Sequence, residues 1–252
     1  MKVSVIIPVY NEFRTFNQVL ERVQKAALPE GCSKEIIGVD DGSTDGTAQV
    51  LGEHARAGVI VGQHSDANFG KGTAIRAGIA VASGDIVIIQ DGDLEYDPND
   101  YARILEPIVG GQADVVYGSR FLGKPAGMAV KYRVANRILT AAANFLYDAH
   151  LTDEATAYKA FRVSVLRELR LDCRRFEFCP EVTAKLRRLK YRIHEVPITY
   201  NARGIAEGKK IRFRDGLEAL WTLLKYRVVT RRTLVREESA PAPVLATHRG
   251  YF

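Results

Sequence analysis

The first 120 residues alternate short β-branched runs with helix-like segments, and this alternation limits the possible folds more than any other feature. Five runs predict buried strands, namely VSVIIPVY (3–10), EIIGVD (35–40), VIVG (59–62), DIVIIQD (85–91) and ADVVYGSR (113–120). Helices are expected between them, up to about residue 27 and over 46–57, 68–83 and 100–109. Alternating strands and helices indicate βαβ units, so we predict an α/β fold with a mostly parallel sheet flanked by helices.

The remaining sequence continues the same domain. It predicts helices over 129–147, 163–169, 180–188 and 215–231, and strands over 157–161 and 191–200. Pro197 near the end of the last strand favours an edge position. We expect one domain over 1–232 and a disordered polar tail over 233–252, which contains two prolines.

Charge is distributed unevenly along the chain. Residues 1–120 hold 10 Lys and Arg against 17 Asp and Glu, whereas the remainder holds 26 against 13. An acidic front half can hold a cation, and a basic back half can face phosphate or an anionic membrane surface. Nucleic acid is the least expected partner, because the basic residues lack interleaved aromatic side chains.

The apolar runs and the cysteines indicate the cellular setting. No apolar run approaches the ~20 residues of a membrane-spanning helix. The three cysteines are odd in number and lack metal-ligand spacing, which predicts a reduced, cytoplasmic compartment.

Polar clusters follow four of the predicted strands. The carboxyl ends of parallel strands meet at one edge of a sheet, where ligands bind. We therefore expect four clusters to converge there: Asn11-Glu12, Asp40-Asp41, Asp91–Glu95 and Ser119-Arg120.

The segment VIIQDGDLEYDP (87–98) places an acid at every second position after a buried strand. Like charges this close disfavour one another, so a positive partner is expected. Hard carboxylate oxygens suit Mg²⁺ or Mn²⁺. An EF-hand is excluded because Tyr96 and Ala102 stand where Gly and Glu are needed. A phosphatase with Asp91 as nucleophile, and a solvated acidic turn, remain open on these residues alone.

Five segments that follow the predicted strands and open the predicted helices occur in a fixed order and spacing: PVYNE (8–12), VDDGSTDGT (39–47), NFGKGTAIRAG (68–78), QDGDLE (90–95) and GSR (118–120). In this order and spacing they resemble the family 2 glycosyltransferases of GT-A fold. The later segments TDEATAYKAFR (152–162), FEFCPE (176–181) and YNARGIAEGKKI (200–211) are similar to the dolichyl-phosphate mannose synthase and polyprenyl-phosphate glycosyltransferase branch. The resemblance covers roughly residues 1–230.

This resemblance implies a nucleotide-sugar half over 1–120 and an acceptor half over 121–232. Asp93 and Glu95 would hold a divalent ion, Mg²⁺ or Mn²⁺, that bridges the donor's diphosphate, although many relatives have Gln in place of Glu95. The residues expected to bind the nucleotide sugar are Pro8, Val9, Tyr10, Glu12, Val39, Asp40, Asp41, Lys71, Asp91, Gly92 and Asp93.

The resemblance also implies an inverting, metal-dependent transfer of a hexose, from UDP-glucose or GDP-mannose, to a polyprenyl or dolichyl phosphate. Asp153 is the candidate catalytic carboxylate, with an N-cap or a salt bridge to Arg162 as its structural alternatives. Four basic residues are expected to bind the acceptor phosphate: Arg120, Arg133, Arg203 and Lys210.

The helix over 215–231 carries an apolar stripe with basic residues at its end. The stripe comprises Leu217, Leu220, Trp221, Leu224 and Val228. We expect it to pack on the core with Trp221 buried, and the basic end to be attracted to a membrane surface. Two alternatives stay open: the stripe itself could lie on the bilayer, or it could dock on a membrane-embedded partner subunit.

Two other functions stay open from the sequence. The same donor chemistry could act on a saccharide or small-molecule hydroxyl, which would need Asp153 as a general base. A non-catalytic nucleotide-sugar-binding subunit is the alternative from another class, and the intact acidic cluster argues against it.

Overall fold

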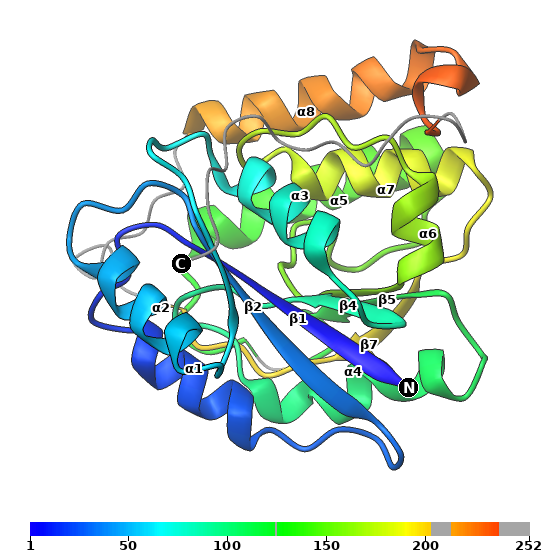
Figure 1. The fold of residues 1–252 in the computed structure, drawn as a ribbon. Coiled ribbons are helices and arrows are strands. Elements are labelled where there is room, and N and C mark those ends of the chain that lie inside the picture. The colour runs from blue at the N-terminus through cyan, green and yellow to red at the C-terminus, as the bar shows by residue number, and fades with distance from the viewer. Residues whose placement is uncertain (124, 203–212, 237–252) are drawn as a thin grey trace.

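The computed structural model describes residues 1–123, 125–202 and 213–236. Within them the chain builds one seven-stranded sheet in the order β3-β2-β1-β4-β6-β5-β7 (Figure 1). All pairings are parallel except those of β6, which runs antiparallel to both β4 and β5. The strands are β1 Lys2–Val9, β2 Ser33–Asp40, β3 Val61–His64, β4 Ile86–Ile89, β5 Val115–Ser119, β6 Lys159–Arg162 and β7 His194–Pro197.

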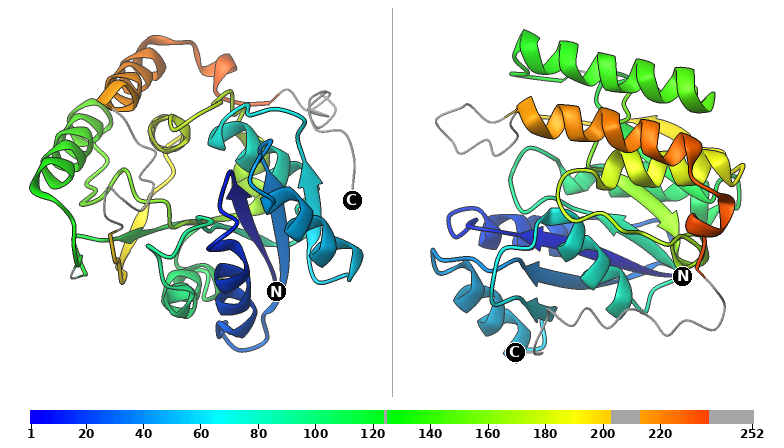
Figure 2. Two further views of the ribbon diagram at one scale, coloured as in Figure 1. Left: turned by 90° about the vertical axis from the view of Figure 1, so that its left-hand side faces the viewer. Right: turned by 90° about the horizontal axis from the view of Figure 1, so that it is seen from above.

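Helices cover both faces of the sheet. One face is covered by α1 (Phe16–Lys25), α2 (Thr47–Arg56) and α4 (Tyr101–Val109). The other is covered by α3 (Lys71–Val81), α6 (Val163–Glu168) and α7 (Phe178–Arg188). Two further helices, α5 (Val130–Tyr147) and α8 (Phe213–Val228), pack on α7 and lie side by side (Figure 2). Short 3₁₀ helices are η1 (Pro98–Asp100) and η3 (Arg231–Thr233).

The apolar run of β1 is continuous because both of its sides are buried. Val3, Val5 and Ile7 face the core on the side of α1 and α4, whereas Ile6 faces the core on the side of α3. Helix α3 approaches β1 closely at Gly78, where a Cβ atom would overlap the side chain of Ile6. This close packing sets the distance between α3 and β1.

Each predicted strand and helix is present, with its bounds shifted by a few residues. The predicted edge position of the last strand is confirmed, since β7 ends the sheet. Residues 233–236, which we assigned to a disordered tail, are part of the fold: Leu234 is fully buried and Val235 forms a bridge with Leu169. Residues 237–252 lie outside the described part of the chain.

The prediction that the apolar stripe of α8 packs on the core is wrong. Trp221 is 66% exposed, and Leu217, Leu224 and Val228 are exposed with it. The helix instead buries its opposite side, which comprises Ala219, Thr222, Leu223 and Tyr226. The small and polar residues on that side fit the close contact with α5 and α7, where the Tyr147 hydroxyl donates to the Leu223 carbonyl.

Glu35, near the start of β2, is expected to make the free energy of unfolding depend on pH in the acidic range. Burial would raise its pKa, but hydrogen bonds from Lys2, Ser4 and Ser83 outweigh that effect and lower the pKa from 4.5 to about 2. A lowered pKa means that this stabilisation is complete above pH 4.5 and is lost as the pH falls from 4.5 through 2.

We expect Glu35→Gln to lower the free energy of unfolding at pH 7 by about 2 kcal/mol, since a neutral amide cannot accept all of these bonds. Urea denaturation at pH 7 and at pH 3 measures this. The deficit should shrink at pH 3; an equal deficit at both pH values would contradict the assignment. Glu21→Gln, at an exposed ion pair with Lys25, is the control that should change little.

Candidate active site

The predicted polar clusters meet at the carboxyl edge of the sheet, next to the point where strand order reverses between β1 and β4. The side chain of Asn11, after β1, accepts from the backbone N–H of Thr44 at 2.8 Å. Thr15 donates to the carbonyl of Gly92, after β4, at 3.0 Å. These contacts join the segments that follow β1, β2 and β4, so three of the four predicted clusters meet directly. The fourth, Ser119-Arg120 after β5, is connected to Glu95 through Tyr200.

The candidate nucleotide residues after β1 and β2 line this edge. Asp41 accepts from the backbone N–H groups of Phe69 and Gly70 at 2.9 and 2.7 Å. Burial raises the pKa of Asp41 to about 6, against the lowering effect of those two bonds. Asp40 is buried and contacts His64 Nδ1 at 2.9 Å. Five further candidates lie on or just after the ends of these two strands, namely Pro8, Val9, Tyr10, Glu12 and Val39, and Gly92 follows β4.

Lys71 supplies a positive partner to the acidic cluster. It is the first residue of α3, and its Nζ lies 2.5 Å from Asp91 Oδ1. Burial alone would lower the pKa of Lys71, but the neighbouring Asp91 outweighs this and raises it. Lys71 therefore stays charged at the carboxyl end of β4. It supplies part of the positive charge that we expected beside the mutually repelling acidic residues.

The acidic segment turns after β4 rather than continuing as a strand. Asp93 Oδ1 accepts from the backbone N–H of Glu95 at 3.0 Å, which closes a tight local turn. Glu95 Oε2 accepts from the Tyr200 hydroxyl at 3.0 Å. A Cβ atom at Gly92 would lie 2.7 Å from Val9 Cγ1, so the turn rests directly on the end of β1. The turn thus holds Asp93 and Glu95 near the donor candidates of β1.

Within the described residues, no three His, Cys, Asp or Glu side chains are grouped as a complete metal site. The donor set still fits a divalent ion. Mg²⁺ commonly takes one or two carboxylates from the protein and its other ligands from substrate phosphates and water. Asp93 and Glu95 provide two such carboxylates, and a nucleoside diphosphate would provide the phosphate oxygens.

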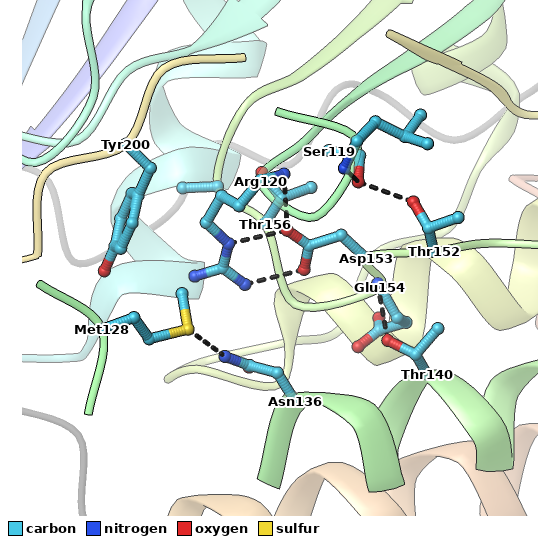
Figure 3. A network of polar contacts seen from close by, with 12 residues as sticks. Ser119, Arg120, Met128, Asn136, Thr140, Thr152, Asp153, Glu154, Thr156 and Tyr200 are labelled. Atoms are coloured by element: carbon cyan, nitrogen blue, oxygen red, sulfur yellow. Dashed lines mark hydrogen bonds and ion pairs between the residues drawn. The ribbon is translucent and has the colours of Figure 1, made fainter. Parts of the chain in front are cut away.

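Asp153 and Arg120 form a buried ion pair on the acceptor side (Figure 3). Arg120 Nε and Nη2 each donate to Asp153 at 2.7 Å, and the backbone N–H of Arg120 adds a third bond at 3.0 Å. Asp153 is fully buried and Arg120 is only 6% exposed. The alternative pairing of Asp153 with Arg162 is wrong, because Arg162 contacts Asp114 at 3.1 Å.

The sequence analysis missed two residues that organise this region. Glu195, on β7, accepts from the backbone N–H groups of Thr152 and Asp153 at 2.7 and 3.0 Å. Tyr200 places its ring 5.1 Å from Arg120 Cζ while its hydroxyl holds Glu95. The signal was available for Tyr200, since it opens the segment YNARGIAEGKKI that carries part of the resemblance.

The other acceptor-phosphate candidates are placed differently. Arg133 is exposed on α5. Arg203 and Lys210 lie outside the described residues. Among the candidates within the described residues, Arg120 is connected to the acidic turn through Tyr200. The Tyr200 ring lies beside the Arg120 guanidinium, and the Tyr200 hydroxyl donates to Glu95.

The model of glycosyl transferase family 2 matches residues 4–170 of this chain. The chain belongs to glycosyltransferase family 2. An undecaprenyl-phosphate mannosyltransferase from Micrococcus luteus is 32% identical over 83% of this chain and 87% of its own length. An undecaprenyl-phosphate 4-deoxy-4-formamido-L-arabinose transferase from Edwardsiella ictaluri is 32% identical over 82% of this chain, which spans 62% of that relative. The family and branch predicted from the motifs are confirmed.

Solved structures of glucosyl-3-phosphoglycerate synthase from Mycobacterium tuberculosis share the fold of this family 2 member. The complex with UDP has a TM-score of 0.69 and 20% identity, and it covers 91% of this chain and 81% of that one. The complex with Mn²⁺, UDP and glucosyl-3-phosphoglycerate has a TM-score of 0.66 at 22% identity, with the same coverage. The predicted GT-A fold is confirmed.

Proposed function

We propose that this protein transfers a hexose, glucose or mannose, from a nucleoside diphosphate sugar to a polyprenyl phosphate. One observation carries the proposal: a carboxylate turn and a buried arginine occupy the same edge of the sheet, joined by Tyr200. The relatives named for transfer to undecaprenyl phosphate support this choice of acceptor. UDP-glucose and GDP-mannose are the proposed donors.

On the donor side, Asp93 and Glu95 are the residues that would hold Mg²⁺ or Mn²⁺. Bound there, the ion would stabilise the negative charge that develops as the nucleoside diphosphate leaves. Structures of the M. tuberculosis neighbour with UDP and Mn²⁺ or Mg²⁺ support the choice of ion. Residues after β1 and β2 would bind the nucleoside, and Lys71 would neutralise Asp91 beside it.

On the acceptor side, Arg120 would attract the phosphate and Asp153 would hold the guanidinium in place. An acceptor oxygen forms a bond to C1 of the sugar as the bond from C1 to the diphosphate oxygen breaks, which inverts the anomeric centre. A phosphate monoester has its second pKa near 6, so it is largely dianionic at pH 7. Orientation by cations then matters more than removal of a proton.

Transfer of radiolabel tests this proposal. The full chain is incubated with labelled UDP-glucose or GDP-mannose, Mn²⁺ and a short polyprenyl phosphate, and the lipid product is extracted. We expect one donor to label the organic phase, and only when metal is present. Label that stays in the aqueous phase with both donors would refute the lipid acceptor.

A small hydroxyl acceptor is the second candidate. The structural neighbour was solved with phosphoglyceric acid, an acceptor that also carries a phosphate. Arg120 would bind the phosphate of such a molecule, and Asp153 would have to take the hydroxyl proton. Labelled phosphoglycerate product in the same incubation would favour this acceptor.

An exposed apolar surface lies on the pair α5 and α8, and we propose that it docks on an anionic membrane. Along α5 the exposed residues are spaced at helical intervals, and Phe145 is 89% exposed. Cations flank both stripes, and α5 carries no acidic residue. No helix among the described residues has both the length and the apolarity to cross a bilayer. The surface comprises Val130, Val134, Ile138, Phe145, Leu217, Trp221, Leu224 and Val228.

The cations beside this surface are Lys131, Arg133, Arg137, Arg214, Lys225 and Arg227. Basic residues around an apolar face are typical of surfaces that lie on anionic lipid. Such docking would hold the protein at the membrane surface, where a polyprenyl phosphate is found. The cytoplasmic face is the proposed location, in keeping with the free cysteines Cys32, Cys173 and Cys179.

The double variant Phe145→Glu, Trp221→Glu is expected to bind vesicles at least ~10-fold more weakly, because each aromatic side chain contributes about 1.5–3 kcal/mol when buried. Co-flotation with vesicles that contain phosphatidylglycerol measures this. Val59→Glu, at an exposed valine away from both helices, is the control and should float like the unmodified chain. Equal flotation of all three proteins would rule out this surface.

A further inference from the structure

Tyr200 lies between the two halves of the candidate active site. Its hydroxyl donates to Glu95 Oε2 at 3.0 Å. Its ring centroid is 5.1 Å from Arg120 Cζ, within the range of a cation–π contact. Tyr200 is only 2% exposed to solvent. One side chain thus contacts a donor-side carboxylate and the acceptor-side arginine.

The backbone around Tyr200 is hydrogen-bonded on both of its sides. Asn201 N–H donates to the carbonyl of Glu95 at 2.9 Å, and Tyr200 forms an antiparallel bridge with Tyr96. On its other side, the Tyr200 carbonyl accepts from Ala126 N–H at 2.9 Å. The ring also packs edge-on against Tyr96, with centroids 5.1 Å apart. Tyr200 therefore has little freedom to move away from either Glu95 or Arg120.

Two features separate the roles of the hydroxyl and the ring. The hydroxyl occupies Oε2 of Glu95, which restricts how that carboxylate can rotate. The ring covers Arg120, whose Nε and Nη2 already point to Asp153 (Figure 3).

We propose that Tyr200 is a positioning residue that sets Glu95 for the divalent ion through its hydroxyl and sets Arg120 for the acceptor phosphate through its ring. The inference rests on the proposed function, and it adds to it the residue that holds the donor site and the acceptor site in a fixed relative position. Groups that orient a metal-binding carboxylate typically change metal affinity or activity by 10–100-fold when removed.

Tyr200→Phe tests the hydroxyl alone, because the ring is kept. We expect UDP-dependent binding of Mn²⁺, measured as loss of the free-ion electron paramagnetic resonance signal, to weaken about 10-fold. The KM for the phosphate acceptor should stay within about twofold. Tyr200→Leu also removes the ring, and it should raise the acceptor KM about 10-fold as well, since a desolvated cation–π contact is worth up to about 2 kcal/mol.

Tyr101→Phe is the matched control. Tyr101 is a fully buried tyrosine whose hydroxyl donates to Gln90 at 2.7 Å, so the same atom is removed from a similar setting away from Glu95. It should leave both Mn²⁺ binding and the acceptor KM unchanged. Thermal melting of all variants separates a loss of stability from a loss of metal affinity.

A double-variant comparison makes the test independent of folding effects. If the hydroxyl acts through Glu95, the added cost of Tyr200→Phe to Mn²⁺ binding should be much smaller in a Glu95→Gln background than in the natural chain. Unchanged Mn²⁺ binding by Tyr200→Phe, or an equal cost in both backgrounds, would overturn the inference. Failure of the proposed function looks different, since the natural chain would then bind no Mn²⁺ with UDP or transfer no label.

Discussion

Asp93→Ala is expected to lower kcat/KM for sugar transfer about 1,000-fold, which corresponds to roughly 4 kcal/mol of lost transition-state stabilisation. Asp93 lies in the turn after β4, and its Oδ1 accepts from the N–H of Glu95, so the substitution removes a proposed metal ligand and loosens the second one. Excess Mn²⁺ should not restore the rate. Initial rates across a Mn²⁺ titration measure both effects.

Asp97→Asn is the control for Asp93→Ala. Asp97 lies in the same acidic segment, and its side chain caps η1 by accepting from Asn99 N–H at 3.0 Å. Asparagine caps equally well, so the variant removes one negative charge from the segment and should retain near-normal activity. Near-normal turnover of Asp93→Ala at saturating Mn²⁺ would show that Asp93 does not hold the ion.

Asp153→Asn is expected to have the largest effect on stability. It leaves the guanidinium of Arg120, which is 6% exposed, without its buried counter-charge. Breaking a buried ion pair in this way typically costs about 3–5 kcal/mol. For a chain of this length that cost lowers Tm by roughly 6–15 °C. Calorimetry measures the shift.

The catalytic effect of Asp153→Asn depends on the acceptor. With polyprenyl phosphate, the KM should rise about 10-fold while kcat changes little, because Arg120 is less well oriented but no proton must be removed. With a hydroxyl acceptor, loss of a general base should lower kcat by about 100-fold or more. A large fall in kcat with lipid phosphate would contradict our assignment of Asp153 as the partner that orients Arg120.

Asp114→Asn provides the matched control for Asp153→Asn. Asp114 also pairs with an arginine, Arg162, at 3.1 Å, but both side chains are partly exposed to solvent. Exposed pairs contribute about 0–1 kcal/mol, so this variant should melt close to the natural chain. The contrast between the two pairs isolates the effect of burial.

The front half of the fold follows directly from sequence patterns. Runs such as VSVIIPVY are almost continuously apolar, interrupted only by Ser4, which indicates burial on both sides and therefore a parallel sheet between helices. The position of the donor candidates followed from the same rule, since residues after parallel strands share an edge.

The acceptor half was harder to predict because its contacts join distant segments. Asp153 pairs with Arg120 across 33 residues, and Tyr200 reaches Glu95 across 105. No local period encodes such contacts. The stripe of α8 was misjudged for a related reason: amphipathicity shows that one side of a helix is apolar, but not which side the neighbouring helices cover.

The reversed direction of β6 has a consequence for how the chain assembles. Among the strands of the described residues, β5 and β7 join the rest of the sheet only through β6, which pairs with β4 over residues 86–88 and 160–162. During synthesis the first four strands can associate early, whereas β5 must wait for residues 159–162 to emerge before it has a neighbour within the sheet. Ribosome-stalled chains that end before and after β6 should therefore differ sharply in protease resistance of the 113–123 segment.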